Sequence, residues 1–412
     1  MNKDPGSAAR RTRRHTMLTA VAASAVAALA AACSSGGGSS STPQASSSLT
    51  KSQIVIGAVG TYSGAAGAEN VEVPAFEQAW AKWTNDNGGI NGHPVKFVTV
   101  DDQDVAATAI AGVDNLVQNQ KVVALVGPAE AGLETTWASY VQKAGVPVVG
   151  GDAYTPVWNT NPDFFLSTSD LTTAVYSGAN LAARQGKTSY GVVNCNEESA
   201  CVQAIKLHQA AAKAAGMKFV YGATAPDTAP NYTANCLAAK NAGAQTLSVG
   251  VGSPTAMSEL ATNCAQQGYK PLYVFNATSI TPSLLTNPNV NGAIVPLTSF
   301  PWFYQGPETK DYQQVLALAG IGSQQNGPAL ALAYGADELF AKAASEVTGD
   351  VTSASLVNAL YTMKGETLGG LVPPLTFTKG AATRSSTCYF VAEVQNGAMV
   401  APQGLKTDCL SS

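Results

Sequence analysis

Residues Gln53–Val100 read QIVIGAVGTYSGAAGAENVEVPAFEQAWAKWTNDNGGINGHPVKFVTV, and this stretch decides the fold. Two short apolar runs rich in β-branched residues, 53–59 and 94–100, flank a longer helix-forming segment, 74–89. That segment closes on Gly88-Gly89, and glycine is a common stop signal for a helix. The order strand, helix, strand predicts a unit whose two strands run parallel.

The same alternation continues along the chain. Most of the apolar runs do not alternate with polar residues, so the strands are expected to be buried on both faces beneath helices. A doubly wound α/β fold with parallel sheets follows. Further strands are predicted at 122–127, 146–151, 189–194, 218–223, 244–251 and 271–276. Further helices are predicted at 104–120, 131–145, 200–215, 232–242 and 255–267.

The folded part is too long for one such sheet. About 360 residues follow the segment that ends at position 52, which suits two lobes. The strand-and-helix series restarts near 164–170, and we place the first crossing between the lobes there. The loops at the carboxyl ends of the strands would then line a cleft between the lobes. These loops read GTYSG, GPAEAG, GGDAYTP, NCNEESAC, GVGSPT and FNATS.

The N-terminal segment has the layout of an export signal. Four arginines precede an apolar run, 17–32, which is short for a membrane span and ends at Cys33. The sequence LAAAC resembles a bacterial lipobox, although Ala30 stands where leucine is usual, and an ordinary cleaved signal is the alternative. We therefore predict a signal peptide at 1–32, lipid on Cys33, and a flexible Gly/Ser-rich tether over 33–52.

The seven cysteines fit an exported protein. Lipid on Cys33 leaves six, and an even number in an oxidising compartment indicates disulfides. Pairing of sequence neighbours is the simplest arrangement: Cys195 with Cys201, Cys236 with Cys264, and Cys388 with Cys409. Zinc is the rival interpretation, but no pair has C-x-x-C spacing and the chain holds three histidines. No metal or other cofactor is therefore predicted.

Catalysis and nucleic-acid binding both lack support. The chain has no G-x-S-x-G elbow, H-E-x-x-H motif or Walker loop. Asp101 and Asp102 are adjacent on an extended chain and point to opposite faces, so they are expected to cap a helix or to hold an inter-loop hydrogen bond. Without the signal, 18 basic and 26 acidic residues give a net charge of −8, with no clustered basic surface for nucleic acid.

Binding of a small molecule fits better, because a cleft needs only hydrogen-bonding loops and an aromatic wall. Six large aromatic residues fall in predicted loops and as a set favour such a wall, although each alone suits a structural role equally well. They are Tyr62, Tyr154, Trp158, Trp302, Phe303 and Tyr304.

Several stretches resemble the type I periplasmic binding proteins, in particular the branched-chain amino-acid (leucine/isoleucine/valine) receptors of ABC importers. They are QIVIGAVGTYSGAAG, EQAWAKWTNDNGGINGHPVKFVTVDDQ, VVALVGPAEAG and GVPVVGGDAYTP, and the resemblance extends over 53–405. It implies two lobes joined by three crossovers that close on a ligand. The second crossover would lie near Pro296 and the third near Pro373-Pro374. Lobe I would then comprise 53–167 and 296–372, and lobe II 168–295 and 373–412.

Residue by residue, the resemblance predicts a pocket unlike that of an amino-acid receptor. Glu130 stands near the usual serine, and Asp152-Ala153-Tyr154 replaces the Ala-Thr or Ser-Thr pair that holds a ligand carboxylate. Ser199, Ala277 and Ala329 stand where relatives carry a tyrosine, an acid and an aromatic residue. The complete candidate ligand-binding set is Tyr62, Ser63, Glu130, Ala131, Asp152, Ala153, Tyr154, Ser199, Gly252, Ser253, Ala277, Trp302 and Ala329.

The resemblance implies a solute-binding lipoprotein, not an enzyme, anchored to the outer face of the cell membrane. Its partners would be a small-molecule ligand and the permease subunits of an ABC importer, and we expect a monomer that binds no nucleic acid. The ligand is expected to differ from a plain branched-chain amino acid. A sensor of the same fold that signals to a membrane partner is the alternative, because fold does not fix function. The disulfide between Cys195 and Cys201 is expected to hold a loop at the rim of the cleft.

Overall fold

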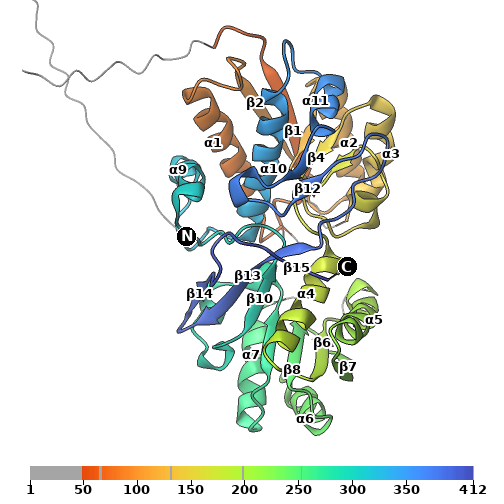
Figure 1. Cartoon of the computed structure of the whole chain (residues 1–412), viewed down its shortest axis with the longest axis vertical. Coiled ribbons are helices and arrows are strands. Elements are labelled where there is room, and N and C mark those ends of the chain that lie inside the picture. The colour runs from red at the N-terminus through yellow and green to blue at the C-terminus, as the bar shows by residue number, and fades with distance from the viewer. Residues whose placement is uncertain (1–48, 65–66, 130–131, 197–198, 252, 412) are drawn as a thin grey trace, which may run out of the picture. The chain divides into compact units, whose positions relative to one another are not determined.

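The computed structural model describes residues 49–64, 67–129, 132–196, 199–251 and 253–411 (Figure 1). The signal peptide, Cys33, most of the tether, Glu130, Ala131 and Gly252 lie outside these ranges, as does the side chain of Ser199. No helix in the described part of the chain combines the length and the apolar surface that a membrane span requires.

The first sheet is entirely parallel and has the strand order β2-β1-β3-β4-β5. Its strands are β1 (Ile54–Gly60), β2 (Val95–Asp101), β3 (Leu125–Val126), β4 (Val148–Val149) and β5 (Phe164–Phe165). The helices that follow its strands are α1 (Val73–Asp86), α2 (Ala106–Gln118) and α3 (Glu134–Ala144), with the short η1 (Pro156–Asn159) before β5. The predicted strand-and-helix order of this lobe is confirmed.

Both faces of this sheet are buried, as non-alternating strands predict. In β3, Leu125 packs into one hydrophobic cluster and Val126 into another, and β5 divides Phe164 and Phe165 in the same way. Neighbouring side chains of a strand point to opposite faces, so helices must cover both sides. On one side Trp137 of α3 stacks on Phe164, with 5.8 Å between ring centroids.

A later segment of the chain returns to the first sheet. It contains α9 (Lys310–Ala319), α10 (Pro328–Ser345) and α11 (Ser353–Leu360), preceded by η4 (Pro307–Thr309). Helix α1 contacts both α9 and α10, and α10 also contacts β3 and β4. Figure 1 shows α10 next to α1 at the first sheet. The helix α10 therefore covers the carboxyl ends of the central strands.

The second sheet has the order β14-β13-β10-β9-β8-β6-β7, with β15 paired to β13. Its parallel strands are β6 (Ser189–Asn194), β7 (Lys218–Thr224), β8 (Thr246–Gly250), β9 (Leu272–Phe275) and β10 (Ile294–Leu297). Its helices are α4 (Leu171–Arg184), α5 (Ser199–Ala214), α6 (Thr233–Asn241), α7 (Pro254–Gln266) and α8 (Pro282–Leu285), and two short turns, η2 (Ala277–Ser279) and η3 (Pro288–Val290), lie between β9 and β10.

One edge of the second sheet is antiparallel, which the sequence reasoning did not predict. The strands β13 (Cys388–Gln395), β14 (Ala398–Val400) and β15 (Asp408–Cys409) add to β10 in antiparallel pairs. Asn396 and Gly397 connect β13 to β14 with positive φ angles of 52° and 81°, the backbone of a tight hairpin turn. A hairpin joins neighbouring strands directly, so it needs no crossover helix.

The chain still contacts the first sheet beyond Pro373-Pro374, the place near which the resemblance puts the third crossover. After α11 the chain forms β11 (Lys364–Glu366), the short η5 (Leu368–Gly370) and β12 (Leu375–Thr376). The strands β11 and β12 pair with each other. Beyond β12, Phe377 packs on Phe165 with 5.3 Å between ring centroids, and the Thr383 hydroxyl donates to the carbonyl of Phe164. Ser385 contacts the start of α4, since its hydroxyl accepts from the Asp170 amide at 2.8 Å. The boundaries of the lobes otherwise stay a prediction.

Three disulfides join Cys195 to Cys201, Cys236 to Cys264, and Cys388 to Cys409. The second ties α6 to α7, and both of its cysteines are fully buried. The third joins paired strands, since Cys388 of β13 lies opposite Cys409 of β15. The second sheet therefore carries all three cross-links among the described residues.

The longest-range and the shortest-range of the three disulfides are expected to differ in their contribution to stability. Cys236–Cys264 spans 28 residues and Cys195–Cys201 spans 6, so the first removes more chain entropy from the unfolded state. Replacing the first pair by alanines should cost roughly 3–4 kcal/mol of unfolding free energy, against roughly 2 kcal/mol for the second. Urea denaturation of the two double variants measures this difference, and a greater loss in the Cys195/Cys201 variant would contradict it.

Candidate functional site

A pocket lies at the carboxyl edge of the first sheet, where open α/β folds bind their ligands. It is enclosed by the loops after β3 and β4 and by the N-terminal parts of α1 and α10. Its lining residues are Asn70, Val73, Gly127, Pro128, Ala129, Gly151, Asp152, Ala329, Leu332 and Ala333. Every one belongs to a segment that packs with the first sheet.

Two consecutive glycines after β4 bring the chain to this pocket. Gly150 and Gly151 have φ angles of 67° and 123°, in the region that favours glycine. A Cβ on Gly150 would lie 2.2 Å from the Cβ of Ala336 on α10, so only glycine allows this close approach. The chain then turns so that the Asp152 amide donates to the carbonyl of Pro128 at 3.2 Å. The two glycines thereby place Asp152 in the wall of the pocket.

A hydrogen-bonded frame holds the loops after β1, β2 and β3 together. The amide of Thr61 donates to the Ala129 carbonyl at 3.0 Å, and the Thr61 hydroxyl donates to Asp102 at 2.7 Å. The side-chain amide of Asn70 donates to the carbonyls of both Thr61 and Ala129. Asp102 thus forms the inter-loop hydrogen bond that the sequence predicts for this acidic pair. The frame fixes one side of the pocket before any ligand arrives.

The electrostatic character of the pocket is set by Asp152. Burial raises the pKa of this carboxyl well above its ordinary value, and the negative charges of Glu69 and Glu134 raise that pKa further. Glu134 exposes 2% of its surface, and its Oε1 accepts from Thr155 at 2.7 Å and from the Trp158 indole at 3.0 Å. None of the lining residues is basic. The pocket is therefore acidic and carries no cation of its own among the described residues.

Two fully buried carboxyl groups lie beneath the floor of the pocket. Glu77 of α1 and Asp337 of α10 are each 0% exposed, and each carboxyl group affects the pKa of the other. Burial raises the pKa of Glu77 to about 8, and burial together with the charge of Glu77 raises that of Asp337. One Glu77 oxygen lies 3.4 Å from where a Cβ on Gly127 would be. Because two adjacent carboxylates repel, the pair is expected to share a proton.

The structure brings together only part of the candidate set. Asp152 and Ala329 line the pocket, and Tyr154 follows Asp152 with its side chain 39% exposed. Ser63 is exposed in the loop after β1, whereas Tyr62 is buried with its ring over Gly60. These outcomes place the first-lobe part of the candidate site around Asp152.

The other described candidates have structural roles or lie elsewhere. Ala153 is buried in the hydrophobic cluster of α2 and α3 and does not line the pocket. The Ser253 hydroxyl caps α7 by accepting from the Ala256 amide at 3.1 Å. Ala277 begins η2 and is half-buried against the core.

The two tryptophans of the expected aromatic wall are buried in the structure. Trp158 is 1% exposed and donates its indole N–H to Glu134, and Trp302 is 6% exposed within the largest hydrophobic cluster. Both loops fold back onto the sheet, so these rings find core positions that linear sequence does not reveal. Phe303 and Tyr304 are half-buried, which leaves Tyr154 as the exposed aromatic residue of the six.

Four pocket residues lie outside both the candidate set and the predicted cleft loops: Asn70, Val73, Leu332 and Ala333. A sequence signal existed for two of them. Leu332 and Ala333 follow the candidate Ala329 at the i+3 and i+4 spacing that places side chains on the same face of a helix. Val73 is the first residue of α1 and Asn70 lies three residues before it, and no motif marked either.

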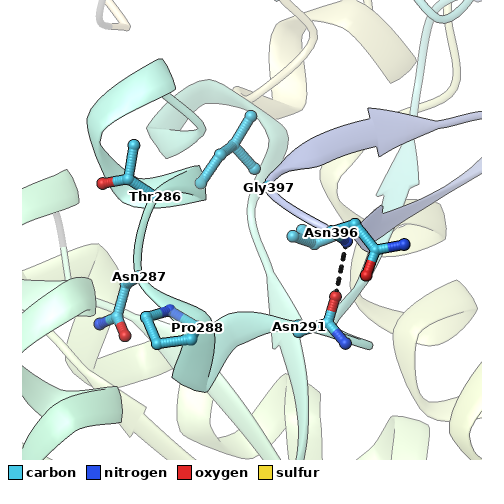
Figure 2. Close-up of a pocket in the computed structure, with 8 residues that line it drawn as sticks. Thr286, Asn287, Pro288, Asn291, Asn396 and Gly397 are labelled. Carbon is cyan, nitrogen blue, oxygen red and sulfur yellow. Dashed lines mark hydrogen bonds between the residues drawn. The ribbon is translucent and has the colours of Figure 1, made fainter.

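A second pocket, of about 390 Å³, opens on the second sheet's antiparallel edge (Figure 2). Thr286, Asn287, Pro288, Asn291, Asn396 and Gly397 line it, together with Leu285 and Val394. Asn291 accepts a hydrogen bond from the Asn396 amide at 2.7 Å, which ties the hairpin turn to the loop after η3. This pocket holds no charged side chain and does not lie at the end of a parallel strand. We therefore centre the candidate site on Asp152.

Two helix-covered α/β sheets and a pocket at the strand ends define a class, that of two-lobed binding proteins. The chain belongs to the periplasmic binding protein family, whose model matches residues 53–398. Members of this family are extracytoplasmic solute-binding proteins of ABC transporters, and their family and fold are not those of enzymes. A search of curated protein sequences gave no match.

Solved structures share the fold at low sequence identity. A binding protein from Rhodopseudomonas palustris HaA2 in complex with p-hydroxybenzoic acid is 18% identical, with a TM-score of 0.71, over 87% of this chain and 98% of that one. A branched-chain amino acid ABC transporter protein from Thermus thermophilus with bound valine is 15% identical, with a TM-score of 0.72, over 86% and 96%. A periplasmic substrate-binding protein from Ralstonia solanacearum is 18% identical, with a TM-score of 0.68, over 84% and 99%. At these identities the likeness establishes the fold.

Proposed function

We propose that this protein captures a small organic solute between two lobes and delivers it to the permease of an ABC importer. Membership of the family supports the role in solute capture for an ABC importer. The acidic pocket around Asp152 supports the narrower proposal about the kind of solute. By the resemblance noted in the sequence, relatives that bind amino acids hold the ligand carboxylate at this place. The solute is therefore proposed to differ from a plain branched-chain amino acid.

The physical argument is the cost of two carboxylates at short range. A ligand carboxylate beside Asp152 would enter a site where burial and the charges of Glu69 and Glu134 already raise the pKa of the Asp152 carboxyl, so further negative charge is unfavourable there. The lining residues offer no basic side chain to compensate. Charges buried without a partner cost several kcal/mol, which exceeds what small apolar contacts with a valine or leucine side chain return.

Titration calorimetry with leucine and valine tests this proposal. We expect no heat of binding for either at millimolar concentration with protein purified without bound solute. Submicromolar binding of leucine that is unchanged in an Asp152→Ala variant would contradict the proposal, because Asp152 would then not face the ligand.

The location is proposed from the sequence. Lipid on Cys33 and the Gly/Ser-rich tether would hold the folded part at the outer face of the cell membrane. Fractionation of cells that produce the full chain tests the anchor: the wild type is expected in the membrane fraction and Cys33→Ser in the soluble fraction. Equal release of both would contradict a lipid anchor and leave solute binding unaffected.

A further inference from the structure

We infer that the solute carries a cationic group, an ammonium or a guanidinium, and that Asp152 receives it. The inference rests on the proposed function, since it names the chemical class of the solute that the pocket would take.

The first support is that Asp152 lines the pocket without a partner. Two hydrogen bonds hold its backbone. The Asp152 amide donates to the Pro128 carbonyl, and the Asp152 carbonyl accepts from the Tyr154 amide at 3.0 Å. Its carboxylate receives no hydrogen bond and no ion pair from any described residue, although the loop places it in the pocket wall. A cationic ligand would supply the missing counter-ion and favour the ionised form of this carboxyl group, and the fixed loop keeps the ordering cost small.

The second support is the negative field behind Asp152. Besides burial, the charges of Glu69 and Glu134 both raise the pKa of the Asp152 carboxyl. Glu134 exposes 2% of its surface. One Glu134 oxygen is hydrogen-bonded to Thr155 and Trp158, while Oε2 has no partner among the described residues. Fixed negative charges in a partly desolvated pocket repel an anion and attract a cation much more strongly than they would in water.

The third support is an aromatic face beside the acid. Tyr154 follows Asp152 by two residues, and its amide donates to the Asp152 carbonyl; burial, together with the charges of Asp152 and Glu69, raises the pKa of its hydroxyl. Tyr154 is 39% exposed and is one of few large apolar side chains that reach the surface of the described chain. A cation over the face of a tyrosine ring gains a further attraction.

A series of probes with one carbon skeleton and different charge tests the inference. The probes are 3-methylbutylamine, 3-methylbutanol and 3-methylbutanoate, with 2-phenylethylamine, 2-phenylethanol and phenylacetate as a larger set. Affinities for the wild type are measured by titration calorimetry and thermal shift. In whichever probe set the pocket accommodates, the amine should bind at least tenfold more tightly than the alcohol, and the carboxylate should bind most weakly.

Two variants and a control locate the effect. Asp152→Asn should reduce the preference for the amine over the alcohol to within about threefold while the protein keeps its melting temperature, because Asp152 has no hydrogen bond to lose. Glu69→Gln should reduce the preference in part. Asp86→Asn is the matched control, since Asp86 lies at the exposed end of α1 and pairs only with Lys82; its ranking should equal that of the wild type.

The affinity of the amine should also rise with pH in the wild type and not in Asp152→Asn, since a raised Asp152 pKa means that the carboxylate forms only as pH rises. A preference for the alcohol or the carboxylate, or an amine preference that survives Asp152→Asn, would overturn the inference and leave solute binding intact. If no probe of any charge binds, the proposed function itself fails for solutes of this size.

Discussion

Replacing Gly150 with alanine is expected to destabilise the protein by roughly 3 kcal/mol or more. The φ angle of 67° costs an L-residue about 1–2 kcal/mol, and the new Cβ would lie 2.2 Å from the Ala336 Cβ and 2.7 Å from the Ala336 Cα. The second atom belongs to the backbone of α10 and cannot rotate away, so the loop and the helix must separate. Overpacking of this kind adds about 1–3 kcal/mol.

Gly145 provides the matched control. It ends α3 with a φ of 68°, and no atom lies within 4 Å of where its Cβ would be. Gly145→Ala should therefore cost about 1 kcal/mol, the backbone contribution alone. Urea denaturation of both variants separates the cost of backbone strain from the cost of the contact between the new Cβ and α10. Equal losses would show that α10 does not press on the loop as described, and the position of Asp152 would then be in question.

The second large effect is expected at the Glu77–Asp337 pair, as a dependence of stability on pH. Glu77 has a folded-state pKa of about 8 and an ordinary, lower pKa when unfolded, so the folded protein binds more protons between the two values. Stability from this group is thus fully present below the unfolded pKa and falls as pH rises toward about 8. One proton corresponds to about 1.4 kcal/mol per pH unit.

Glu77→Gln tests this directly, because an amide can still donate to Asp337 but does not titrate. Across this pH range, we expect the slope of unfolding free energy against pH to become less steep by the contribution of about one proton. Glu346→Gln is the control, since Glu346 caps the exposed end of the same α10 and pairs with Lys342; its pH dependence should follow the wild type. A pH profile in Glu77→Gln as steep as that of the wild type would contradict a shared proton.

The alternation of strands and helices could be predicted because its signals are local. The strand 189–194 and the helices near 200–215 and 255–267 lie within one residue of their predicted limits, since apolar runs, glycine and proline mark them in the sequence. The β13–β15 edge was missed because it follows the last crossover and is defined by pairing with β10. Pairing partners far apart in sequence leave no local pattern.

The pocket was predicted less completely for the same reason. Asp152 and Ala329 came from their places after a strand and at the start of a helix, and both line the pocket. The burial of Trp158 depends on Glu134, and that of Glu77 on Asp337, 260 positions away. Tertiary partners decide whether an aromatic ring or an acid faces core or ligand, and a single sequence does not name those partners.

The central claim is that the pocket around Asp152 holds an organic solute. Native mass spectrometry of protein purified without refolding tests it, on the wild type, on Ala329→Trp, which fills the pocket wall, and on Ala317→Trp, which alters an exposed position of α9. We predict a small-molecule adduct on the wild type and on Ala317→Trp that denaturation releases unchanged, and none on Ala329→Trp. An adduct of equal occupancy on all three proteins would contradict this assignment of the site.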